Sequence, residues 1–250
     1  MKKQFLFTAV IISGVLFSCT KEKIETSQSQ TLESATVAQS SVENIGQMSV
    51  PRINLDPVGR FEFDGNLQDK TGNLPNGISN GGQPVSYTTS RNGTGASLYL
   101  SGTYGINLNS VPTQTKGSIA VWVKSSSTPD YRSFIGKSGS GIFFAQSVNT
   151  YYGGVSIDAL GGSAPAIYGI ASDYKWHHLA VTYDGSNIRA YGDGVLKQTI
   201  PFAGSFAQYL ATYYLGYTPG VAGFWKGCLD DLRFYNRTLS SSEVQSLATL

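Results

Sequence analysis

The chain is poor in the residues that crosslink or charge a protein. Its 250 residues include only two cysteines. Cys19 follows an apolar run near the start and Cys228 lies directly before a predicted strand, so no disulfide framework is predicted. Charged residues make up 14% of the chain and the net charge is +2. Nucleic-acid-binding proteins carry a basic stripe or patch. The lysines and arginines here form none, so we expect no nucleic-acid partner.

Signatures of catalysis are also scarce. The only histidines, His177 and His178, are adjacent. Neighbouring side chains on a strand point to opposite faces, so this pair cannot grip one metal ion or act on one substrate atom. Cys228 lies directly before a predicted strand, so we expect no cysteine–histidine nucleophile pair. We expect structural histidines, and we expect Cys228 to be a small buried apolar side chain.

Long apolar runs are missing apart from one near the start. A basic beginning precedes Gln4–Phe17, a mostly apolar stretch of about 14 residues, which is too short for a membrane-spanning helix but suits a signal peptide. The stretch ends in Leu16-Phe17-Ser18-Cys19. This sequence resembles the bacterial lipoprotein cleavage box, although Phe17 replaces the usual small residue. The resemblance implies a signal peptide over residues 1–18 and acylation of Cys19. An ordinary secretory signal is the alternative.

Residues 19–52 differ from the rest of the chain. They carry a few charges and then a tract rich in serine, threonine and glutamine, with no sustained apolar period. Such a segment buries too little apolar surface to offset the entropy of ordering, so we expect a flexible tether. The lipid anchor is the only membrane contact we expect. The anchor and the tether together predict a protein of the bacterial cell envelope, held at the outer membrane or cell surface.

Residues 53–250 are predicted to form one all-β domain. The chain has 29 glycines and 12% aromatic residues, with more tyrosine than phenylalanine, and short apolar segments recur between turn signals. This pattern favours two packed antiparallel sheets. The predicted strands are 58–64, 85–89, 97–100, 106–108, 118–125, 132–136, 142–147, 155–160, 167–171, three within 176–199, 213–216 and 229–235. The one predicted helix is Ser241–Leu247, which Ser240 and Glu243 start with a capping box.

The stretch from Trp176 to Thr199, WHHLAVTYDGSNIRAYGDGVLKQT, predicts three strands joined by tight turns. Leu179, Val181 and Tyr183 alternate with polar or small residues, and Asp-Gly and Gly-Asp-Gly supply the turns. The stretch resembles the central signature of laminin-G-like, concanavalin A-like jelly-roll domains. Further matches in the family's order are Phe63–Leu67 with Asp69, Gly117–Lys124 and Lys226–Ser240. The resemblance implies a two-sheet antiparallel jelly-roll sandwich.

Some relatives of this fold are glucanases, so we looked for a catalytic pair. Retaining glycoside hydrolysis uses two carboxyl groups about 5–5.5 Å apart, and Glu62-Phe63-Asp64 has the spacing that places two acids on one face of a strand. The glucanase motif continues with a further acid, where Asn66 and Leu67 stand here. We therefore expect no enzyme. Glycoside hydrolysis is the third of the functions considered.

Relatives of this fold often hold a structural calcium between the opening loop and the closing strand. The resemblance implies Asp64, Asp69 and Asp230 as calcium ligands, because carboxylate oxygens suit this ion. The alternative is that these acids form turns and face solvent.

Aromatic residues in predicted loops indicate a ligand site. Sugars stack on aromatic rings, and binding loops sit on rigid scaffolds. The candidates are Tyr131 in a strand connection, Tyr151 and Tyr152 in a predicted turn over 149–154, and Tyr217 and Trp225 at the ends of a Gly/Pro-rich loop. Of Tyr151 and Tyr152, we expect one to face inward and one outward. Ordinary surface or sandwich packing is the alternative for each.

The sequence therefore predicts a lipid-anchored surface protein with one laminin-G-like binding domain over residues 53–250. The leading hypothesis is glycan binding. The alternative is adhesion to a surface or matrix protein, or a structural role in an envelope complex, because this fold serves many functions.

Overall fold

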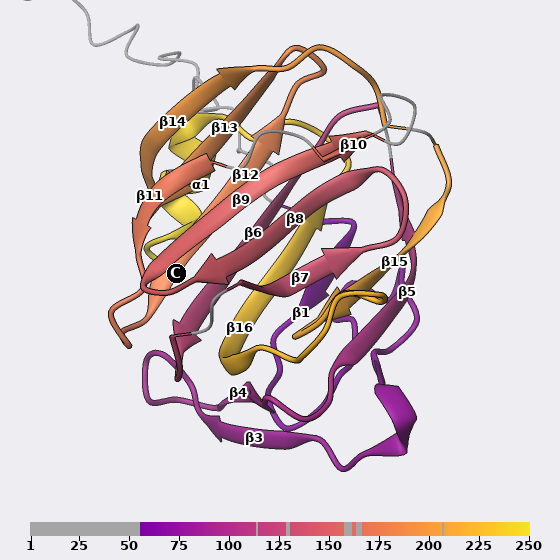
Figure 1. Cartoon of the computed structure of the whole chain (residues 1–250), viewed down its shortest axis with the longest axis vertical. Helices are drawn as coiled ribbons and strands as arrows, with labels where there is room; N and C mark the ends of the chain where they lie inside the picture. The colour runs from indigo at the N-terminus through magenta and orange to yellow at the C-terminus, as the bar shows by residue number, and fades with distance from the viewer. Residues whose placement is uncertain (1–55, 114, 129–130, 158–161, 164–166, 207) are drawn as a thin grey trace, which may run out of the picture. The chain divides into compact units, whose positions relative to one another are not determined.

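The computed structural model describes residues 56–250, except for 114, 129–130, 158–161, 164–166 and 207. The predicted signal peptide and tether, with Cys19, lie outside the described residues. The described chain forms two antiparallel sheets of eight strands each, which lie one behind the other in Figure 1. No helix among the described residues is long and apolar enough to cross a membrane.

The first sheet, here sheet A, lies at the back in Figure 1 and contains the central meander. Its strands run in the order β14-β13-β12-β6-β16-β4-β3, with β1 paired to β16. Their bounds are β1 Gly59–Phe61, β3 Ser86–Thr89, β4 Ala96–Ser101, β6 Gly117–Ser125, β12 His177–Tyr183, β13 Asn187–Gly192, β14 Val195–Pro201 and β16 Lys226–Tyr235.

The second sheet, here sheet B, faces the viewer in Figure 1. Its order is β10-β9-β8-β7-β15-β5-β2, with β11 paired to β9. Its strands are β2 Ile78–Ser79, β5 Ile106–Pro112, β7 Arg132–Lys137, β8 Gly141–Ser147, β9 Thr150–Ile157, β10 Gly162–Ser163, β11 Ile167–Ala171 and β15 Leu210–Leu215. A single 3-10 turn, η1 Asn80–Gly82, follows β2.

The core lies between the sheets, as the alternation of side chains predicts. Leu179, Val181 and Tyr183 of β12 belong to the main buried cluster, whereas Ala180 belongs to a second cluster on the other face of sheet A. The helix α1 Ser241–Leu247 covers that second cluster with Val244 and Leu247. Its capping box between Ser240 and Glu243 is present, so the predicted helix and its start are confirmed.

The predicted turn over 149–154 is wrong. Residues Thr150–Ile157 form one strand, β9, and Gly153 lies inside it because the two sheets approach each other closely there. A Cβ atom at this position would lie 2.3 Å from Cγ2 of Val181 on the opposite sheet. Glycine within a strand marks such a close approach as well as a turn, and the sequence alone does not distinguish the two.

Candidate functional site

The outer face of sheet B carries the candidate site, and β8 and β9 form its floor. Ile142 and Phe144 of β8 belong to the buried core, and Phe143 between them is partly exposed. In β9, Tyr151 is buried, whereas Tyr152 is partly exposed. Because side chains alternate along a strand, Phe143 and Tyr152 both lie on the outer face of the sheet.

A cavity of about 200 Å³ opens on this face. Strands β7, β8 and β9 supply most of its lining, and the loop formed by residues 216–225 supplies the remaining wall. The lining residues from the strands and their ends are Tyr131, Ser133, Gly136, Lys137, Phe143 and Ser156, and those from the loop are Thr218 and Val221. Serine and threonine hydroxyls therefore alternate with apolar and aromatic surface, as in pockets for small polar ligands.

Two tyrosines form an aromatic pair at the edge of this cavity. Tyr131 is 44% exposed, and its ring stacks beside that of Tyr152, with centroids 6.2 Å apart and an interplanar angle of 27°. The pair presents flat aromatic surface next to the hydroxyl groups of the cavity. The sequence singled out both residues, and the structure brings them together.

The loop formed by residues 216–225 packs directly on β7 because residue 136 has no side chain. A Cβ atom at Gly136 would lie 2.2 Å from Oγ1 of Thr218, so the loop can rest on the sheet only because residue 136 is glycine. Oγ1 of Thr218 is itself buried and has no hydrogen-bond partner. A buried hydroxyl without a partner costs about 1–3 kcal/mol.

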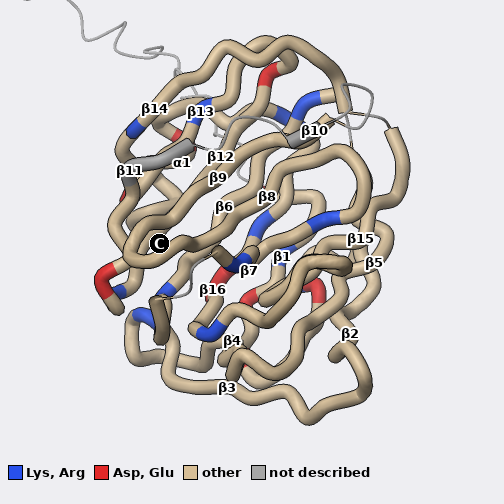
Figure 2. Tube along the Cα trace, viewed as in Figure 1, with Lys and Arg blue, Asp and Glu red and all other residues tan. Residues whose placement is uncertain are grey.

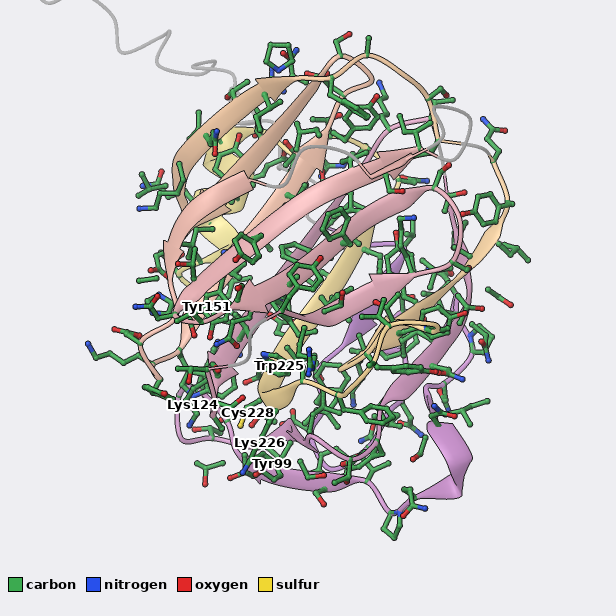
Figure 3. All side chains as sticks on the ribbon, viewed as in Figure 1. Tyr99, Lys124, Tyr151, Trp225, Lys226 and Cys228 are labelled. Atoms are coloured by element: carbon green, nitrogen blue, oxygen red, sulfur yellow. The ribbon has the colours of Figure 1, made fainter. Side chains whose placement is uncertain are left out.

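Two of the predicted ligand residues lie in the core. Tyr151 and Trp225, both labelled in Figure 3, are 0% exposed. The Tyr151 hydroxyl accepts a hydrogen bond from the Ser125 backbone N–H (2.8 Å), and burial raises the pKa of Tyr151 to about 12. Trp225 packs on Phe134 with centroids 5.3 Å apart. Neither ring is available for stacking on a ligand, so we leave both out of the site.

Tyr217 belongs to a separate aromatic cluster. Its hydroxyl donates to Oδ1 of Asn107 (2.5 Å), and its ring lies between those of Tyr214 and Phe224, at centroid distances of 5.2 and 5.6 Å. The cluster supports the loop whose Thr218 lines the cavity. Sequence reasoning missed Phe143 and Thr218. Adjacent side chains on a strand face opposite sides, so one of Phe143 and Phe144 in the predicted strand 142–147 had to face outward.

The structure places the acids predicted as calcium ligands in two different surroundings. Asp69 lies in its own loop, where its carboxylate accepts hydrogen bonds from the backbone N–H groups of Arg60, Thr71, Asn73 and Leu74 and from the Thr71 hydroxyl. Asp64 and Asp230 line a different cavity, together with arginines. Among the residues that the structure describes, no three His, Cys, Asp or Glu side chains are placed to hold a metal ion.

The acids considered for catalysis are not two neighbours on one strand face. Strand β1 ends at Phe61, and Phe63 is left-handed with φ 59°, so the predicted strand over 58–64 ends early. Glu62 pairs with Arg60 (2.8 Å) and with Lys70 (3.6 Å).

The histidines point to opposite faces, as predicted. His178 is buried beside Trp122, with ring centroids 5.4 Å apart, and burial lowers its pKa to about 4. The ring nitrogens of His177 instead contact carboxylates from two turns, Nδ1 with Asp193 and Nε2 with Asp173, both at 2.8 Å. Hydrogen bonding to Asp193 raises the pKa of His177, burial opposes this rise, and Asp173 adds to it. Both histidines therefore have structural surroundings.

Comparison with known proteins agrees with this architecture. The family model Laminin_G_3, of the concanavalin A-like lectin/glucanases superfamily, matches residues 100–245. The chain therefore belongs to this superfamily, and its fold is the all-β, two-sheet jelly-roll sandwich with a short C-terminal helix that the sequence predicts. A comparison with curated proteins found no match.

Several solved structures have the same fold. Domain 4 of AbnA, an extracellular GH43 arabinanase of Geobacillus stearothermophilus in complex with arabinotriose, is 25% identical, with a TM-score of 0.62 over 77% of this chain and 98% of that domain. The ligand-binding domain of botulinum neurotoxin serotype D, in complex with N-acetylneuraminic acid, is 14% identical, with a TM-score of 0.60 over 78% of this chain. The chain spans about half of that toxin domain (51%), and the likeness shows the fold alone.

Proposed function

We propose that the protein binds glycans on the outer face of sheet B, in the cavity bordered by Tyr131, Tyr152, Phe143 and Thr218. The observation that carries the proposal is the exposed Tyr131–Tyr152 pair beside a cavity of about 200 Å³. The apolar C–H face of a sugar suits the aromatic rings, and its hydroxyls suit the serine and threonine groups.

The relatives support this class of ligand. Domain 4 of the arabinanase AbnA is in complex with arabinotriose and is matched over 98% of its length. Arabinotriose is therefore a concrete first probe for this chain. We further propose that the domain binds without cleaving, because β1 ends at Phe61 and Glu62 and Asp64 do not share one face of a strand.

We propose that the domain is displayed at the cell envelope. The sequence up to Cys19 resembles a lipoprotein signal, and residues 19–52 have the composition of a tether. A lipid anchor and a tether together would hold a rigid binding domain away from a membrane. There the protein would capture polysaccharide for other surface proteins or fix the cell to a matrix.

Titration calorimetry with arabinotriose and a glycan array test the proposal. We expect Tyr131→Ala and Tyr152→Ala each to weaken glycan binding about tenfold, since a stacked aromatic contributes about 1 kcal/mol beyond its buried area. Thr218→Val keeps the shape of the side chain and removes only a buried hydroxyl, so we expect binding close to that of the wild type. Tyr99→Ala is the matched control: Tyr99 lies in β4, between the core residues Leu98 and Leu100, and so faces outward from sheet A.

Binding that is unchanged in both tyrosine variants would overturn the site. A protein partner retained without any glycan signal would favour the adhesion alternative. Release of reducing sugar that Glu62→Gln abolishes would instead favour an enzyme.

A further inference from the structure

A second polar cavity, of about 150 Å³, lies where the opening loop meets the closing strand. Three segments form it: the residues after β1, the loop between β3 and β4, and the middle of β16. Four carboxylates line it, from Glu62, Asp64, Asp230 and Asp231, and the guanidinium groups of Arg60 and Arg91 lie among them. The proposed glycan site on sheet B uses none of these residues.

A bulge in β16 gathers two of these acids. The register of β16 against β6 shifts between Asp230 and Arg233, and Asp231 is left-handed with φ 44°. Regular alternation would send consecutive side chains to opposite faces of the sheet. The bulge re-aims them, as bulges commonly do, so that Asp230 and Asp231 both reach Arg91.

Arg91 is held on two sides. Its Nη1 lies 3.1 Å from Oδ2 of Asp230, and its Nη2 lies 3.9 Å from Oδ2 of Asp231. Its guanidinium carbon lies 5.0 Å from the centre of the Trp122 ring, a cation–π distance. The side chain is only 14% exposed, so the charge lies inside the domain, between acids and an aromatic face.

The buried acid Asp230 needs a positive partner. It is 3% exposed, and its Oδ2 lies 3.1 Å from Nη1 of Arg91. A buried charge without a partner is costly, and a paired and hydrogen-bonded one is tolerated.

We propose that the guanidinium of Arg91 takes the position of a structural metal ion in this domain. It joins the loop between β3 and β4 to Asp230 of β16 and neutralises this carboxylate. The neighbouring Asp231 is paired with Arg233 at 2.8 Å and with Arg60 at 3.1 Å, so neither acid is left to attract a divalent cation. The domain is then complete without calcium, although the opening loop and closing strand carry the acids that a calcium site would need.

Thermal melting of the full-length protein in millimolar calcium and in chelator, slightly above neutral pH, tests the proposal. For the wild type we expect equal melting temperatures in the two buffers. Arg91→Met removes the charge and keeps much of the side-chain volume. We expect this variant to melt lower in chelator, and calcium to recover part of the loss. Lys70→Met is the control, because Lys70 is an exposed cation that pairs only loosely with Glu62 (3.6 Å). We expect no calcium response from it.

Three results would overturn the proposal: a wild-type melting temperature that rises with calcium, an Arg91→Met variant as stable as the wild type in chelator, or a loss in that variant that calcium does not reduce. If Arg91→Met does not fold, calorimetric titration of the wild type with calcium decides the question, with no binding expected. Arg91→Lys then provides the graded variant. It retains the charge without the planar fork, so we expect a smaller loss of melting temperature than any neutral substitution gives. A loss as large as that of a neutral residue would contradict the proposal.

Discussion

Trp225 lies between the sheets and ends the loop that forms one wall of the proposed glycan site. Its Nε1 donates to Oε1 of Gln146 (2.6 Å), a side chain that is itself 0% exposed. The amide nitrogen of Gln146 donates to the carbonyl oxygens of Ser127 and Val148, at 2.8 and 2.9 Å. One buried amide therefore joins three loops at the same end of the sandwich.

Replacing Trp225 with phenylalanine should expose the importance of this amide. Trp225→Phe leaves Oε1 of Gln146 buried without its donor, and a buried unsatisfied acceptor costs about 1–3 kcal/mol. We expect a loss of unfolding free energy of that size in chemical denaturation. Tyr217→Phe, which removes a hydrogen bond from a more accessible position, should lose less. Equal stabilities of wild type and Trp225→Phe would show that the amide network contributes nothing.

At the scale of elements, His177 connects two turns that belong to different strand pairs. Asp173 lies between β11 and β12, and Asp193 lies between β13 and β14. Hydrogen bonds from both ring nitrogens to carboxylates are most favourable when the imidazole is protonated, because a neutral imidazole can donate from only one nitrogen. The histidine therefore links the two turns in a pH-dependent way.

The direction of this dependence follows from the raised pKa of His177. Hydrogen bonding to Asp193 is its main cause. A histidine whose pKa is higher in the folded state contributes stability below its ordinary pKa of 6.5 and loses that contribution as the pH rises through the folded value. We expect the melting temperature of the wild type to fall towards that of His177→Gln as the pH rises above about 6.5. A constant difference between the two proteins across this range would contradict the assignment.

The elements that the sequence predicted well are those specified by local residues. The helix Ser241–Leu247 begins where Ser240 and Glu243 cap it, and the central meander turns at Gly185 and Gly194, both left-handed. These features depend on residues a few positions apart, which a sequence displays directly.

The features that the sequence did not predict depend on distant partners. Gly153 was placed in a turn because its reason for being glycine, the nearby Val181 of the other sheet, is remote in sequence. The sequence predicted that one of Tyr151 and Tyr152 faces inward, which is confirmed, but it did not say which of the two. The position of Thr218 on Gly136 follows from sheet order, and so does the pairing of Arg91 with Asp230. Sheet order is not visible in local patterns.

At the scale of the whole molecule, the net charge of the chain is only +2. Lys and Arg are interspersed with Asp and Glu along the described sandwich (Figure 2). No continuous basic band crosses the face shown. Attraction to an acidic membrane surface would need such a band. The membrane attachment that we propose is through an acylated Cys19.

Cys19→Ser should release the protein from membranes. Each buried methylene of an acyl chain contributes about 0.8 kcal/mol, so a variant that cannot carry the proposed acyl chain should lose the attachment. We expect the wild type to partition with the membrane fraction and Cys19→Ser to appear in the soluble fraction. Cys228→Ala serves as the control, because Cys228 is buried in sheet A and should leave partitioning unchanged. A Cys19→Ser protein that remains with membranes would contradict lipid anchoring.

Alternate residues of strand β9 pack in the core and face the proposed binding surface. Tyr151, Gly153 and Val155 face the interior, whereas Tyr152 and Ser156 face the cavity side. A combinatorial library could therefore randomise 152 and 156, together with Phe143 on the neighbouring strand, and leave folding yield unaffected. New sugar specificities could then be selected on an unchanged scaffold, because the core side chains and the recognition side chains lie at different positions of the same strand.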